Sequence, residues 1–137
     1  MTTPSEVLVA RRYLERGFLD TAMELFVRHA PTVDRSDWLR LADGLMDRLR
    51  IADVVRICAL GEIPLPRERI LALGDARLRR RDLDGAKALY ELADADVARW
   101  QRFVDVLTAM PGRARLAISI AERYLAGADA GARAALG

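Results

Sequence analysis

The chain has 137 residues, of which 52% are hydrophobic and 31% are charged, and its formal net charge is only +2. This composition suits one domain of ordinary size with a buried core, and no apolar run is long enough to span a bilayer. The first residues lack a basic segment followed by an apolar stretch, so we expect no signal peptide. The single cysteine, Cys58, excludes an internal disulfide and suits a reducing, cytoplasmic compartment.

Apolar residues recur at helical spacing from Pro4 to Leu14, and Gly17 interrupts the pattern. A second helical segment reaches Val27 and ends before Pro31. The short connection between the two predicts antiparallel neighbours, that is, one helical hairpin.

The rest of the chain repeats this arrangement. The predicted hairpin units span about residues 4–33, 34–65, 66–95 and 96–126. The alanine- and glycine-rich tail, 127–137, is expected to be frayed or to form a short capping helix. No extended alternation of apolar and polar residues predicts a strand.

The units are related by a fixed spacing of 32 residues. A small residue recurs at Ala10, Ala42 and Gly74, and a larger apolar residue recurs 16 positions later in each unit. We expect the small residues to be packing sites where two helices approach closely. The fourth unit falls about one residue off this register, as expected of a terminal repeat.

These positions resemble the tetratricopeptide repeat family. The matching residues are Ala10, Tyr13, Gly17, Ala22 and Phe26, then Trp38, Leu41 and Ala42, then Leu73, Gly74, Ala86, Tyr90 and Ala93. The resemblance implies an all-α fold, a right-handed α-α superhelix (solenoid) of about four antiparallel hairpins. The chain departs from the family in its shorter period and in unit two, where Leu49 stands in place of the turn glycine.

In that family the first helix of each hairpin lines a concave groove, which implies three rows of groove residues here. They are Val7, Leu39, Leu71 and Gln101; Arg11, Asp43, Asp75 and Asp105; and Leu14, Met46, Leu78 and Thr108. Apolar rows beside an aspartate row favour an amphipathic or basic partner segment. The partner-binding residues are predicted to be Val7, Arg11, Leu14, Leu39, Asp43, Met46, Leu71, Asp75 and Leu78.

An alternative interpretation places the leucines in the core and the aspartates in solvent. The family's clamp for C-terminal carboxylates resembles a basic, asparagine-containing groove. This chain has no asparagine, and aspartates at three of the four middle-row positions would repel a carboxylate, so we do not expect that role.

The strongest basic segment, Arg67–Arg81, raises the alternative of nucleic-acid binding. The aspartates that follow it offset its charge, and no aromatics are interleaved with it, so we do not expect that partner. A lone His29 and a lone Cys58 in different units favour neither a metal site nor a nucleophile, and we expect no cofactor and no catalysis.

The sequence therefore predicts a non-enzymatic protein-interaction module: a scaffold, an adaptor or an assembly chaperone. Small bacterial secretion chaperones are one class that fits in length. A structural subunit of a larger complex is the main alternative.

Overall fold

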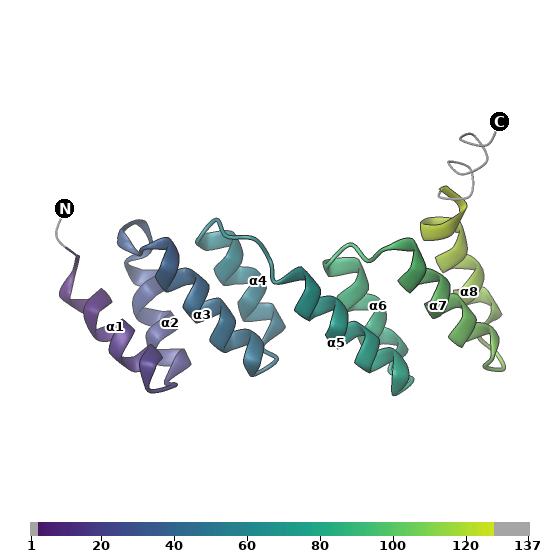
Figure 1. The fold of residues 1–137 in the computed structure, drawn as a ribbon, viewed down its shortest axis with the longest axis horizontal. Coiled ribbons are helices and arrows are strands. Elements are labelled where there is room, and N and C mark those ends of the chain that lie inside the picture. The colour runs from purple at the N-terminus through teal and green to yellow at the C-terminus, as the bar shows by residue number, and fades with distance from the viewer. Residues whose placement is uncertain (1–2, 128–137) are drawn as a thin grey trace. The chain divides into compact units, whose positions relative to one another are not determined.

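The structure is a computed structural model that describes residues 3–127. Within those residues every regular element is helical, which confirms the all-α prediction (Figure 1). The α-helices are α1 (Ser5–Glu15), α2 (Leu19–Arg28), α3 (Arg35–Asp47), α4 (Ile51–Leu60), α5 (Arg67–Arg79), α6 (Leu83–Leu92), α7 (Val97–Thr108) and α8 (Ala114–Ile120). A 3-10 turn, Ala30–Thr32, follows α2, and a π-helical turn, Ala121–Leu125, follows α8. The predicted tail from residue 128 onward lies outside the described residues.

The helix bounds repeat with the period of the sequence. The second helices of the first three hairpins begin at Leu19, Ile51 and Leu83, each 32 residues after the last. The fourth begins at Ala114, 31 residues later, which matches the register slip noted in the sequence.

The chain divides into two compact units, one ending at Leu65 and the other beginning at Pro66. In the first unit α1 packs against α2, α3 packs against α4, and α2 contacts α3. In the second unit α5 packs against α6, and α7 packs against α8 and the π-helical turn. Each unit has its own core. The first contains Val7, Phe26, Leu41, Leu45, Val54 and Ile57, and the second contains Ile70, Tyr90, Phe103, Leu107 and Ile120.

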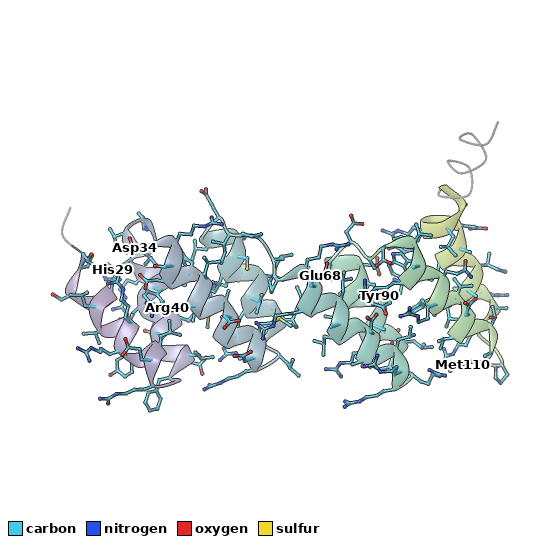
Figure 2. All side chains as sticks on the ribbon, in the orientation of Figure 1. His29, Asp34, Arg40, Glu68, Tyr90 and Met110 are labelled. Atoms are coloured by element: carbon cyan, nitrogen blue, oxygen red, sulfur yellow. The ribbon has the colours of Figure 1, made fainter. Side chains whose placement is uncertain are left out.

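The recurring small residues lie at close helix approaches, as predicted. Ala10, Ala42, Ala86 and Gly74 are all buried. At Gly74 an added Cβ would lie only 2.6 Å from Cε1 of Tyr90, the fully buried aromatic residue of α6 (Figure 2). Cys58 occupies the Tyr90 position of the previous hairpin and is likewise buried. Burial raises the pKa of its thiol, so Cys58 has the properties of a packing residue.

The turn inside each hairpin contains one residue in the left-handed region. The backbone φ angle is 81° at Gly17, 58° at Leu49, 63° at Arg81 and 79° at Gly112. The turn conformation is therefore retained where glycine is not. A leucine or arginine pays a steric cost there that glycine does not.

Leu49→Gly is expected to stabilise the first unit by about 0.5–1 kcal/mol. Relief of the left-handed strain contributes about 1–2 kcal/mol, and the larger chain entropy of unfolded glycine offsets about half of it. The Leu49 side chain is exposed, so little burial is lost. Urea unfolding followed by circular dichroism measures the change. As the control, Leu39→Gly, inside α3, should destabilise by about 1 kcal/mol, and a Leu49→Gly protein no more stable than the parent would contradict the strain argument.

Candidate functional site

A cavity of about 380 Å³ in the second unit lies beside the first helices of its two hairpins. We call it the arginine pocket. It is lined by Asp75 and Leu78 of α5, Arg79 and Arg81 at the end of that helix, and Arg102 and Val106 of α7. The three arginines are exposed, whereas Leu78 is buried. The pocket thus joins an apolar floor to three cationic side chains.

The one acidic residue of the arginine pocket is already neutralised within the unit. Arg99 of α7 donates from Nε to Asp75 Oδ1 at 3.1 Å and from Nη2 to Oδ2 at 3.2 Å. The Tyr90 hydroxyl also donates a hydrogen bond to the same carboxylate. Burial on its own raises the pKa of Asp75, but the bonds from Arg99 and Tyr90 outweigh it, and the pKa lies below its ordinary value.

The pKa values of the two residues bonded to Asp75 are raised. Burial and then the bond to Asp75 raise the pKa of Tyr90, so its hydroxyl stays protonated and donates. Bonds to Asp75 and Asp96 raise the pKa of Arg99. These bonds join α7 to α5, and the other charged residues that line the pocket are arginines.

The first unit has a cavity at the same repeat positions, of about 370 Å³. We call it the mixed pocket. Leu14 stands where Leu78 stands in the second unit, 64 residues earlier, and Arg40 stands where Arg102 stands, 62 residues earlier. Its charged lining residues are Glu15, Arg40, Asp43, Asp47 and Arg48. Both signs of charge line this pocket, in contrast to the arginine pocket.

An ion pair between the first helices of this unit corresponds to Asp75–Arg99 with its charges reversed. Asp37 of α3 is fully buried and accepts bonds from Arg11 of α1, from Nε at 3.0 Å and from Nη2 at 2.9 Å. Arg11 stands at the Asp75 position and Asp37 at the Arg99 position. The bond to Asp37 raises the pKa of Arg11. Each unit therefore joins its two first helices by the same contact with opposite polarity.

The structure separates the predicted partner-binding residues into three groups. The buried ones are Val7, Met46, Leu71 and Leu78, as the core alternative expects. Arg11 and Asp75 are held in the ion pairs just described. Leu39 is exposed, Leu14 is half-buried, and Asp43 lines the mixed pocket with Leu14. Partner binding by these residues stays a prediction. The buried Val7, Met46 and Leu71 offer a partner little surface, and Leu78 reaches only the floor of the arginine pocket.

The basic segment Arg67–Arg81 makes many contacts of its own. Arg67 donates to the carbonyls of Ala93 and Asp94, at 2.9 Å each. Arg77 pairs with Asp82 at 3.4 Å, and Arg69 also has a partner. Within residues 3–127, Arg79 and Arg102 make no hydrogen bond or ion pair. The basic segment predicted from the sequence includes Arg79 and Arg81 but not Arg102. Arg102 aligns with Arg40 only if the first helix of the fourth hairpin is shifted by two residues from the 32-residue register.

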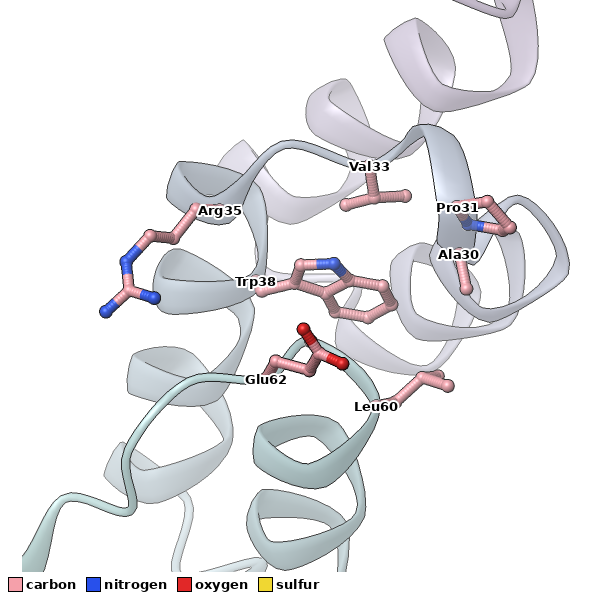
Figure 3. Close-up of a pocket in the computed structure, with 8 residues that line it drawn as sticks. Ala30, Pro31, Val33, Arg35, Trp38, Leu60 and Glu62 are labelled. Atoms are coloured by element: carbon pink, nitrogen blue, oxygen red, sulfur yellow. The ribbon is translucent and has the colours of Figure 1, made fainter.

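Another cavity, of about 500 Å³, is at the other end of the first unit's hairpins (Figure 3). Trp38 forms its floor, and Glu62 lies next to the indole ring. Its charged lining residues are Arg35 and Glu62 alone. This cavity holds no nucleophile and no cluster of titratable groups, so it suggests no chemistry.

Metal and membrane sites find no support in the described part of the chain. No group of three or more histidine, cysteine or acidic residues could hold a metal ion among residues 3–127. His29 contacts the carboxylate of Glu6, and that bond lowers the pKa of Glu6. No described helix is both long and apolar enough to cross a bilayer.

Comparison with known proteins gives no further assignment. No family model, no curated protein and no solved structure matches the chain. The resemblance to tetratricopeptide repeats therefore depends on the repeat positions themselves.

Proposed function

We propose that the chain is a non-catalytic protein-interaction module built from tetratricopeptide-like hairpins, and that its arginine pocket holds an acidic segment of a partner protein. The observation that carries the proposal is that Arg99 and Tyr90 already occupy the carboxylate of Asp75 with hydrogen bonds. With Asp75 occupied, the charges that face a ligand are those of Arg79, Arg81 and Arg102.

This proposal reverses the charge expected of the partner. The sequence places aspartates along a groove and so favours a basic segment. Asp75 is unavailable for that role, because a partner's lysine or arginine would have to displace Arg99 and would meet three further arginines. A glutamate or aspartate beside an apolar side chain matches both the cationic rim and the Leu78 and Val106 floor.

The test is a binding titration with labelled peptides. We expect a peptide of alternating glutamate and leucine to bind the full chain, and a lysine-and-leucine peptide of the same length to bind at least about tenfold more weakly. Arg79→Glu combined with Arg102→Glu should weaken the acidic peptide by about tenfold or more.

The matched control is Arg56→Glu combined with Arg115→Glu, which changes net charge equally at two exposed positions away from the pocket. Fluorescence anisotropy measures each affinity, and circular dichroism checks the fold. Equal losses in the two double variants would reduce the effect to non-specific attraction and refute the arginine pocket as the site.

A further inference from the structure

Helix α1 exposes apolar side chains at positions that are buried on α3 and α7. Val9 and Tyr13 are 47% and 38% exposed. They stand 32 residues before Leu41 and Leu45, which are both 0% exposed. The corresponding residues of the last hairpin, Phe103 and Leu107, are also fully buried. On α5 the corresponding residues, Leu73 and Arg77, are only half-buried. Full burial at these positions is therefore found on α3 and α7, the first helices of the second hairpin of each unit.

In the first unit, α2 packs against the side of α3 that contains Leu41 and Leu45. The Phe26 ring of α2 lies 6.1 Å from that of Trp38, and Leu19 of α2 is close enough to Gly44 that an added Cβ there would lie 3.1 Å from its Cδ2. The repeat therefore places an amphipathic helix at this position. No helix of the described chain precedes α1 to take that place.

Two arginines border the exposed residues of α1. Val9, Arg12, Tyr13 and Arg16 have the spacing of one helical face, and together they line a surface cavity of about 360 Å³. We call them the N-terminal face. Within residues 3–127 neither arginine makes a hydrogen bond or ion pair through its side chain. The Phe18 ring, edge-on to Tyr13 at 6.1 Å, extends the apolar surface.

The repeat positions of the two arginines indicate what would meet them. Arg16 stands at the Arg48 position, where Nη2 donates to the carbonyl of Gly17 in the neighbouring hairpin at 2.7 Å. Arg12 stands at the Gly44 position, where a leucine of the neighbouring helix approaches closely. The cation at position 12 calls for an acidic side chain in place of that leucine.

We propose that the N-terminal face docks an amphipathic helix of a partner protein, with its apolar side on Val9 and Tyr13 and acidic side chains against Arg12 and Arg16. The surface is separate from the arginine pocket, and the inference does not depend on it. Charge argues against a second copy as the occupant. Two N-terminal faces would bring arginines together, and the last hairpin exposes Ile118 among Arg113, Arg115 and Arg123.

The experiment uses the full chain and a labelled helical peptide with a leucine–alanine stripe flanked by glutamates. Val9→Asp combined with Tyr13→Asp should weaken its binding by at least about tenfold, because both residues are expected to be buried in the complex. Val97→Asp combined with Ile118→Asp, which alters two equally exposed apolar residues elsewhere, should change it by about twofold or less.

Charge reversal provides the second arm. Arg12→Glu combined with Arg16→Glu should weaken the glutamate peptide about tenfold and strengthen a lysine-flanked version. The titrations are repeated in a protein that also carries Arg79→Glu and Arg102→Glu, which weaken binding at the arginine pocket. In that background Arg12→Glu with Arg16→Glu should still weaken the glutamate peptide about tenfold, which separates this site from the arginine pocket.

Three results would overturn the proposal. The first is equal binding of the glutamate and lysine peptides. The second is binding to phosphatidylserine vesicles that Val9→Asp with Tyr13→Asp abolishes while peptide binding persists, which would assign the face to a membrane surface. The third is a dimer in sedimentation equilibrium that the same double variant dissociates, which would assign it to a second copy.

Discussion

Replacing Arg11 by aspartate is expected to destabilise the first unit by about 3–5 kcal/mol, and adding Asp37→Arg is expected to recover most of that loss. Asp37 is fully buried, and Arg11 supplies its closest charged partner, with Nη2 at 2.9 Å from Oδ2. Arg11→Asp would place a second carboxylate beside it. Asp37 would keep a bond from Arg40, whose Nη2 lies 3.2 Å from Oδ1, but the Arg40 side chain is mostly exposed. A buried carboxylate would therefore lose its main partner and gain a like charge, which is a large cost in folding.

The second unit indicates why the exchange should succeed. There Asp75 occupies the position of Arg11, and Arg99 occupies the position of Asp37. Arg99 also pairs with Asp96 at 2.7 Å, and the first unit has Asp34 at that position. The introduced arginine at position 37 would therefore have two carboxylate partners. Arg40 would lie nearby as Arg102 does in the second unit, where it is tolerated.

Hydrogen exchange measured by mass spectrometry suits this double-mutant cycle, because it reports the two units separately. Arg12→Asp is the control: Arg12 is exposed, lies next to Arg11 on the same helix and is expected to change stability by no more than about 0.5 kcal/mol. A double variant as unstable as the sum of its single changes would show that the two ion pairs are not equivalent.

Gly74→Ala is expected to destabilise the second unit by about 1–3 kcal/mol, although alanine is the better helix former. The added Cβ would lie 2.6 Å from Cε1 and 2.7 Å from Cδ1 of Tyr90. That ring cannot withdraw, because it packs edge-on against Trp100 at 5.5 Å and its hydroxyl is bound to Asp75. The strain must therefore move a helix.

Gly44→Ala provides the matched comparison for Gly74→Ala. Gly44 is also inside a first helix, but its added Cβ would meet only the methyl groups of Leu19, the nearer at 3.1 Å. A leucine side chain can rotate, so we expect a neutral or slightly stabilising effect from the gain in helix propensity. Urea unfolding of both variants measures the difference. Similar stability for the two would mean that helix propensity, and not the contact with Tyr90, decides the outcome.

The sequence was sufficient for the helices and their packing because a period is visible without knowledge of contacts. Ala10, Ala42 and Gly74 predicted close helix approaches, and the structure buries all three. Gly17 predicted the break between two helices, and the structure places Gly17 and its counterpart Leu49 in the left-handed region at the hairpin turns. The backbone path determines where the helices approach closely and where the turns lie. The side chains at these positions need only fit that path.

The charged residues were harder to assign because their role depends on a partner from another hairpin. Asp75 appeared to be a groove aspartate, since its partner Arg99 lies in the one hairpin that is out of register. The face of α1 that includes Val9 and Tyr13 was missed for a different reason. Apolar residues at core positions predict burial, and a sequence gives no sign that the helix expected to cover them is absent from the described chain.

The opposite polarity of the two ion pairs has a consequence for how similar hairpins find their correct neighbours. If the fourth hairpin packed against α1 in place of the second, Arg11 would meet Arg99. If the second hairpin packed against α5 in place of the fourth, Asp75 would meet the buried Asp37. Like charges in so enclosed a position strongly disfavour both arrangements. A chain of interchangeable repeats could assemble in the wrong order or exchange hairpins with a second molecule. In this one, one reversed contact makes each exchange unfavourable.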